Sequence, residues 1–172
     1  GFCVFNDVCV AARAMQNEGR VKNVLVVDCD VHQGNGTSAI ARGDASLFSF
    51  SMHCEKNYPF QKTEGDYDIA LPVGASDSFY LDQLESGLHE VLNSFVPDFV
   101  FYLAGADPYI KDRLGLLDLS KAGLASRDQM IFDLCREKGI PLAFAMAGGY
   151  APEISDIVDI HFQTVQIAVD SC

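Results

Sequence analysis

Apolar residues recur along this chain in short, nearly unbroken runs, each followed by polar residues or glycine. A further run predicts the last strand, which starts at Pro141, and the runs at residues 24–29 and 99–104 show no regular polar alternation. Such a segment is apolar on both faces, which is typical of a central parallel strand covered on both sides. Residues 47–52 alternate large apolar side chains with serine and predict another strand, and residues 69–73 predict a short one.

Between these runs, apolar residues recur at intervals of three and four, which predicts amphipathic helices. Alternating strands and helices predict one α/β domain over residues 1–172, with three layers around a mostly parallel sheet. The expected helices are 5–17, 37–43, one that Asp77 caps and that runs to Phe95, and 153–169. Between the last two, helical structure opens at Ser120, and a capping box at Ser126 and Gln129 predicts the start of a helix that ends at Gly139.

The first apolar run leads into three polar side chains, Asp28, Asp30 and His32, in the segment DCDVHQGNG. In an extended chain, side chains repeat every two residues, so all three point to the same side. Gly34 and Gly36 directly after them disfavour a helical continuation. Two carboxylates this close repel each other unless one is protonated or a cation lies between them. A metal ion is the simplest neutralising group.

Two further apolar runs deliver polar groups to the same edge of the predicted sheet. The 99–104 run is followed by Asp107, and the last run leads through two glycines to Tyr150. Open α/β sheets bind ligands beyond the carboxyl ends of their strands. Asp30, His32 and Asp107 could therefore supply three metal ligands and leave a fourth position for water, as in catalytic zinc sites. In the alternative interpretation, Asp30 and His32 only cap neighbouring helices.

Composition narrows the classes of function. A net charge of −12, with only 12 Lys and Arg, disfavours a nucleic-acid surface. No apolar run approaches the ~20 residues of a membrane span, so we expect no membrane partner. The 6 cysteines form no C-x-x-C pair, and several lie inside apolar segments. This pattern indicates reduced thiols and a cytoplasmic location.

Taken in order, the motifs of this chain resemble those of the zinc-dependent histone deacetylase family, which has the arginase-deacetylase fold. The motifs are GFCVFND at the start, DCDVHQGNG, FSMH with the later YP, AGAD, RLGLLDLS and AGGY, and they cover residues 1–150. Several motifs in the same order are far more specific than any one alone. Gln33, where many members have a second histidine, and the segment DRLGLLDLS are most similar to the class IV branch and its bacterial relatives.

The resemblance implies a catalytic metal centre. Asp30, His32 and Asp107 would bind zinc, or ferrous iron, since this donor set suits either metal. Tyr150 would polarise the acetyl carbonyl, and the glycines before it would let its side chain swing into place.

The resemblance also implies residues around the metal. Asp28 would orient the first histidine of a catalytic pair, and Asn35 lies where some members use an aspartate to orient the second. From the residues alone, Asp28 could instead cap the glycine loop, and Ser51 could be a strand hydroxyl with a local partner. By resemblance, a structural K⁺ or Na⁺ would be bound around Asp28, Asp30, His32 and Ser51, and the substrate tunnel would be lined by Phe2, Tyr58, Leu114, Gly148 and Gly149.

The family's general base and acid are two adjacent histidines, a few residues before the position equivalent to Gly1. This chain contains no His-His sequence, and His53, His89 and His161 do not match the position of the pair. We expect His89 and His161 on helix surfaces. We also expect the chain to be a fragment of a longer catalytic domain and to be inactive alone.

The predicted function is a metal-dependent amidohydrolase that removes acetyl or longer acyl groups from lysine side chains by attack of a metal-activated water on the amide carbonyl. One alternative is an amidohydrolase of acetylated polyamines or other small amides. Another is a non-catalytic relative that keeps the metal and acts as an interaction module. An arginase-like di-manganese site is a weaker interpretation because it needs a denser set of Asp and His. The intact AGGY motif favours an enzyme.

Overall fold

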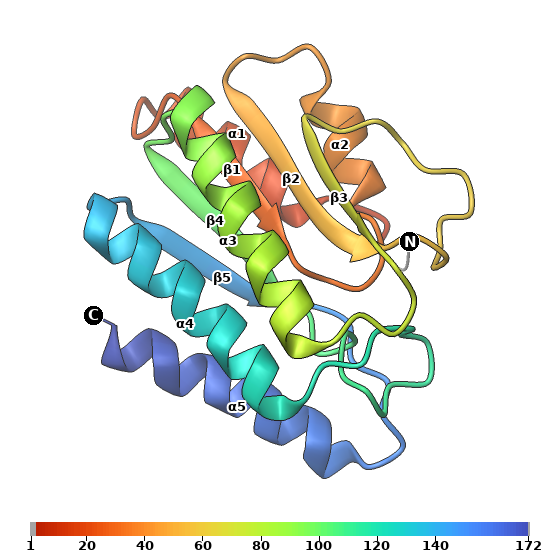
Figure 1. Cartoon of the computed structure of the whole chain (residues 1–172). Helices are drawn as coiled ribbons and strands as arrows, with labels where there is room; N and C mark the ends of the chain where they lie inside the picture. The colour runs from red at the N-terminus through yellow and green to blue at the C-terminus, as the bar shows by residue number, and fades with distance from the viewer. Residues whose placement is uncertain (1–2, 172) are drawn as a thin grey trace.

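A sheet whose strands are all parallel forms the centre of the structure (Figure 1). This computed structural model describes residues 3–171. The strand order is β3-β2-β1-β4-β5, so the strand that leads into the DCDVHQGNG segment lies in the middle. This confirms the predicted α/β class. The strands are β1 (Val24–Asp28), β2 (Leu47–Cys54), β3 (Tyr67–Leu71), β4 (Phe99–Ala104) and β5 (Leu142–Met146).

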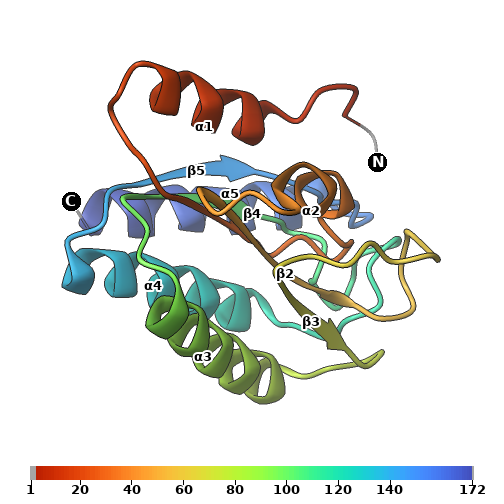
Figure 2. The same cartoon turned by 90° about the horizontal axis from the view of Figure 1, so that it is seen from above.

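Helices cover both faces of the sheet and give the expected three layers (Figure 2). On one face lie α1 (Asp7–Asn17) and α2 (Asn35–Ala41). On the other face lie α3 (Asp77–Ser94) and α4 (Lys121–Lys138), and α5 (Ile154–Asp170) packs beside α4. Every residue of β1 is buried, because alternate side chains enter the two opposite cores. This explains why its sequence shows no polar alternation.

Two strands differ from the prediction at their ends. β2 continues through His53 to Cys54, and nearly all of its residues are buried because helices cover both of its faces. β3 begins at Tyr67 instead of residue 69 and ends at Leu71, and its pairing with β2 starts where Tyr67 lies opposite Phe50. The hydrogen-bonded ladder therefore starts two residues before the predicted strand.

The predicted capping box in the fourth helix is wrong. Ser126 and Gln129 lie inside α4, which is one continuous helix. Its true N-cap is Ser120, whose hydroxyl accepts the backbone N–H of Gly123 at 3.0 Å. The helix ends where predicted, at Gly139, which has a φ of 65° in the left-handed region.

Three further residues differ from the prediction. Asp77 is the first residue of α3, and the cap is Ser76. The carboxylate of Asp77 accepts the backbone N–H of Ser120 at 2.8 Å and the Ser120 hydroxyl at 2.6 Å. It therefore links the starts of α3 and α4. α2 begins at Asn35, two residues early. His161 is half-buried, and its Nδ1 atom has no hydrogen-bond partner among the described residues.

Because β1, β4 and β5 are neighbours and run in the same direction, the loops that follow them meet at one edge of the sheet. These loops carry the acidic and histidine residues and the glycine pair that the sequence singles out. Within residues 3–171, no helix combines the length and apolarity needed to cross a membrane.

Candidate metal centre

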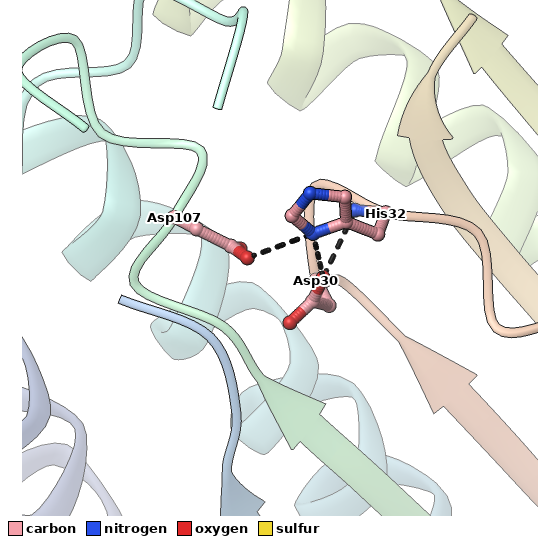
Figure 3. A group of neighbouring side chains, drawn as sticks. All are labelled: Asp30, His32 and Asp107. Atoms are coloured by element: carbon pink, nitrogen blue, oxygen red, sulfur yellow. Dashed lines mark hydrogen bonds and ion pairs between the residues drawn. The ribbon is translucent and has the colours of Figure 1, made fainter. Parts of the chain in front are cut away.

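Three predicted ligands converge at this edge (Figure 3). Asp30 and His32 lie on the loop after β1, and Asp107 lies on the loop after β4. One carboxylate oxygen from each aspartate and one ring nitrogen of His32 all lie within 4.8 Å of one another. Nδ1 of His32 faces both carboxylates, at 3.0 Å from Asp30 and 3.2 Å from Asp107. The sheet topology thus brings together residues that are 75 positions apart in sequence.

Backbone N–H groups from neighbouring strand ends fix the two carboxylates. Val31 donates to Oδ1 of Asp107 at 2.9 Å. His32 donates to Oδ1 of Asp30 at 2.9 Å, and Gly148, from the loop after β5, donates to its Oδ2 at 2.8 Å. Hydrogen bonds to a charged acceptor are the stronger kind, so each carboxylate is oriented before any ligand arrives.

The same contacts shift the pKa values of the centre. Hydrogen bonds to Asp107 and Asp30 raise the pKa of His32 to about 9. Burial raises the pKa of Asp107, and the charge of Asp30 raises it further. Burial acts in the same sense on Asp30, but hydrogen bonds from His32 and from the backbone of Gly148 lower its pKa. A proton on His32 therefore balances part of the carboxylate charge, at the place where a divalent ion would do so.

Gly148 allows the backbone after β5 to approach the carboxylates closely. A Cβ atom at this position would overlap Oδ2 of Asp107 and would lie 2.7 Å from Oδ2 of Asp30. Neither Gly148 nor Gly149 has a positive φ in the described chain. Close approach, rather than conformational freedom, is therefore the physical reason for glycine at 148.

The donor set fits a divalent metal ion. Two carboxylates and one imidazole match the ligands of catalytic zinc or non-haem iron sites, which leave at least one position open. Asp107 is fully buried, whereas Asp30 and His32 retain side-chain exposures of 19% and 21%. The centre is therefore reachable from solvent on the side of Asp30 and His32.

Asp28 and Ser51 lie beside each other beneath the loop after β1. They face each other in the register of β1 and β2, and both are almost fully buried. Oδ1 of Asp28 accepts the N–H of Asp30 at 3.0 Å, and the hydroxyl of Ser51 accepts the N–H of Gly34 at 3.1 Å. The Ser51 hydroxyl also lies 3.0 Å from Nδ1 of His53. Burial, together with the charge of Asp30, raises the pKa of Asp28 well above its ordinary value.

Tyr150 is positioned through its backbone by a residue that the sequence did not single out, Asp112. Oδ2 of Asp112 accepts the N–H of Tyr150 at 2.5 Å, and its Oδ1 accepts the N–H groups of Leu114 and Gly115, both at 2.8 Å. An aspartate that bonds two and three residues ahead forms a local turn, which was the available signal. Burial and the charges of Asp107 and Asp30 raise the pKa of the Tyr150 phenol, so it remains a donor at neutral pH.

Gln33 fixes the long loop between β2 and β3, a role that the sequence did not reveal. Its side-chain N–H groups donate to the carbonyl of Thr63 at 2.7 Å and to Asp68 at 3.0 Å. Its side-chain oxygen accepts the N–H of Thr63 at 2.9 Å. The amide thus uses its donor and its acceptor together on one segment of chain.

Two of the predicted tunnel residues, Tyr58 and Leu114, lie on two loops that are joined to each other, and Gly148 and Gly149 lie on the loop after β5. Tyr58 and Leu114 are 51% and 45% exposed, and the side chain of Asn57 donates to the carbonyl of Leu114 at 2.9 Å. Asn35 is the first residue of α2. Phe2 lies outside the described residues.

Comparisons with known proteins point to one family. The histone deacetylase domain family matches residues 1–165. An uncharacterised protein of Picosynechococcus is 44% identical over 94% of this chain and 54% of its own length, and histone deacetylase 2 of Arabidopsis thaliana is 32% identical over 92% of this chain and 42% of its own. The crystal structure of the HDA15 HD domain, 31% identical, superposes with a TM-score of 0.81 over 98% of this chain and 52% of that one. The chain thus spans about half the length of these relatives.

We expect the affinity of the centre for a divalent ion to rise with pH up to about 9. At neutral pH, His32 carries a proton on the folded chain because its pKa is raised, and that proton must leave before Nδ1 can bind a metal. Raising the pH removes this competition. Zn²⁺ titration by calorimetry in two buffers of different ionisation enthalpy should therefore show proton release at pH 7. A dissociation constant that does not change between pH 6 and pH 9 would contradict the assignment.

Proposed function

This chain belongs to the histone deacetylase family, and from that premise we propose that it forms the metal-binding part of an amidohydrolase that removes acetyl or longer acyl groups from lysine side chains of peptides or proteins. The observation that carries the proposal is the convergence of Asp30, His32 and Asp107 within 4.8 Å, beside the glycine pair that precedes Tyr150. A metal-binding interaction module would have no need of a tyrosine there.

Asp30, His32 and Asp107 would hold one divalent ion, zinc in the first place and ferrous iron as the alternative. When bound, such an ion supplies a nucleophilic water at neutral pH and polarises the amide carbonyl. The protein's part is to fix the donors, which the backbone N–H groups of Val31 and Gly148 support. We also propose a structural K⁺ or Na⁺ beneath the centre, around the residues that follow β1, with Asp28 and Ser51 as ligands.

Tyr150 would donate a hydrogen bond to the substrate's carbonyl oxygen as negative charge develops on it. A phenol is protonated at neutral pH, and the bond from the Tyr150 N–H to Asp112 holds the backbone from which the side chain extends. A fixed donor of this kind stabilises the transition state without reorganisation during the reaction.

Substrate would enter between the two linked loops that carry Tyr58 and Leu114, with Gly148 and Gly149 at the base. The exposed aromatic ring of Tyr58 suits the aliphatic part of an acyl-lysine side chain.

Proton transfer requires a general base. Among the described residues near the centre, His32 is a proposed metal ligand and His53 is buried, so neither is available for this role. His53 is 1% exposed, its Nδ1 lies 3.0 Å from the Ser51 hydroxyl, and burial lowers its pKa. We propose that two adjacent histidines outside these 172 residues serve as base and acid. Asp28 would orient the first of them. Asn35 would orient the second, although a neutral amide raises the basicity of a histidine less than a carboxylate does.

Replacing Asp107 with Ala should remove metal and activity together. Asp107 contributes a buried ligand and also accepts the backbone N–H of Val31, so the loop after β1 loses a contact as well. Metal content would be measured by mass spectrometry, and activity by chelator-sensitive deacetylation of a fluorogenic acetyl-lysine peptide with a version of the protein extended upstream. Asp82→Ala, at an exposed carboxylate on α3, serves as the control. Full metal occupancy in Asp107→Ala would refute the ligand assignment.

Replacing Tyr150 with Phe should leave metal content unchanged and lower kcat by about 10²- to 10³-fold, the usual effect of losing one oxyanion donor. KM should change much less, because the hydrogen bond forms mainly in the transition state. Tyr67→Phe is the matched control, since its hydroxyl bonds only to Glu90 at the surface. An unchanged kcat would mean that Tyr150 is a packing residue.

Residues 1–172 alone should bind metal but deacetylate the peptide at least about 10²-fold more slowly than the upstream-extended protein, because general acid–base groups contribute at least that much. The sequence contains no adjacent histidines. Changing both upstream histidines to Ala in the extended protein should reduce its rate to that of residues 1–172. Rapid, chelator-sensitive deacetylation by residues 1–172 would show that the base lies within them.

A further inference from the structure

Arg127, in the middle of α4, is a fully buried cation for which neither the sequence motifs nor the proposed function supply a role. It is among the largest completely buried side chains of the described residues. Burial of a guanidinium is strongly unfavourable unless its donors are used and its charge is paired. The groups that satisfy it therefore indicate its purpose.

The guanidinium faces an acidic partner on one side and two backbone carbonyls on the other. Its Nε donates to Oδ1 of Asp128 at 2.9 Å, and its NH2 group lies 2.8 Å from the same oxygen. Its NH1 group donates to the carbonyl of Gly105 at 2.7 Å and makes a longer contact of 3.4 Å to the carbonyl of Cys29. The planar fork of Arg directs Nε and NH1 to opposite sides, while NH2 makes an ion pair with Asp128 but no hydrogen bond among the described residues.

The two carbonyls belong to the strand ends that carry the metal ligands. Cys29 directly precedes Asp30, and Gly105 lies two residues before Asp107. The N–H of Cys29 makes a last bond to the carbonyl of Leu103 at 3.1 Å, and beyond it the backbones of β1 and β4 leave the ladder. Arg127 thus supplies a bridge between them at the point where the sheet no longer does.

The strand ends are also unusually close there. A Cβ atom at position 105 would lie 2.7 Å from the Cα of Asp30 and 2.8 Å from Oδ1 of Asp107, so only glycine fits between the two ligands. A small change in the separation of the strand ends would move Asp30 relative to Asp107. Two contacts join the strand ends here: the bond from Val31 to Asp107, and the bridge between the carbonyls of residues 29 and 105.

The other side of the guanidinium is fixed by Asp128, which is itself held by two elements. Its Oδ1 accepts the Tyr102 hydroxyl of β4 at 2.5 Å, and its Oδ2 accepts the Thr164 hydroxyl of α5 at 2.6 Å. The guanidinium also lies over the Tyr102 ring, 5.8 Å from its centroid. Arg127 is therefore oriented by groups that do not contact the metal centre.

We propose that Arg127 is a positioning residue for the metal centre, setting the distance between the backbones that carry Asp30 and Asp107 through their carbonyls. This inference rests on the proposed function, since it assumes that these residues bind a metal. If Arg127 only paired with Asp128 in the core, apolar replacement of both partners would leave metal binding intact, because buried pairs can often be replaced without loss of stability.

The test measures Zn²⁺ affinity by chelator competition and the visible absorption of the Co²⁺-substituted protein, which reports ligand geometry, alongside urea unfolding. Arg127→Met/Asp128→Leu removes the charges and the carbonyl bonds together. Arg127→Lys keeps the charge near Asp128, but its single ammonium cannot make the same fork. Thr164→Val is the matched control, because it removes a bond to Asp128 and leaves the carbonyl bonds in place.

Both Arg127 variants should bind Zn²⁺ about 10- to 100-fold more weakly, the usual range for residues that support metal ligands, and should shift the Co²⁺ spectrum. Thr164→Val should lower the urea midpoint but change neither metal readout. Wild-type affinity and spectrum in Arg127→Lys, or in a folded Arg127→Met/Asp128→Leu, would overturn the positioning role alone. Absence of metal binding by the unmodified protein would instead overturn the proposed function, and the inference with it.

Discussion

The rest of the structure depends on keeping two carboxylates, Asp30 and Asp107, together against their mutual repulsion. Both are desolvated, which is unfavourable unless hydrogen bonds or a cation compensate. The compensating donors are the imidazole of His32 and backbone N–H groups of Val31 and Gly148. These donors follow β1 and β5, and Asp107 follows β4. The site therefore requires that β4 lie between β1 and β5, as it does in the observed strand order.

The sequence predicted that Asp30, His32 and Asp107 meet at one edge of the sheet, because each lies a few residues after a strand. Unbroken apolar runs indicate strands buried on both faces, and parallel strands deliver the next residues to one edge. The pattern thus indicated that Asp30, His32 and Asp107 converge, whereas their assignment as metal ligands rested on the resemblance to a family. The first residue of β3 and the capping box at Ser126 were predicted wrongly for a different reason. The pairing of Tyr67 with Phe50 sets where β3 begins, and the helix that opens at Ser120 continues without a break through Ser126.

The residues that support the centre could not be predicted in the same way. Asp112 lies in a polar loop, where a carboxylate is ordinary, and its importance comes from the N–H of Tyr150, 38 residues away in sequence. Arg127 occupies a helix position that a charged residue would normally expose to solvent, and its contacts with residues 29 and 105 span 98 and 22 positions. Such long-range contacts leave no periodic signal, because a single side chain of suitable length and geometry makes each one.

Gln33 shows a different consequence of side-chain choice. Its amide joins the backbone of Thr63 through a donor and an acceptor at once, and it bonds to Asp68 as well. An amide does not titrate, whereas an imidazole in the same place would exchange donor for acceptor or gain a charge near neutral pH. The two bonds between the Gln33 amide and the backbone of Thr63 therefore do not depend on pH, although His32, the adjacent residue in sequence, competes with protons for a metal. Mild acidification would therefore weaken metal binding while leaving this attachment of the loop to Gln33 in place.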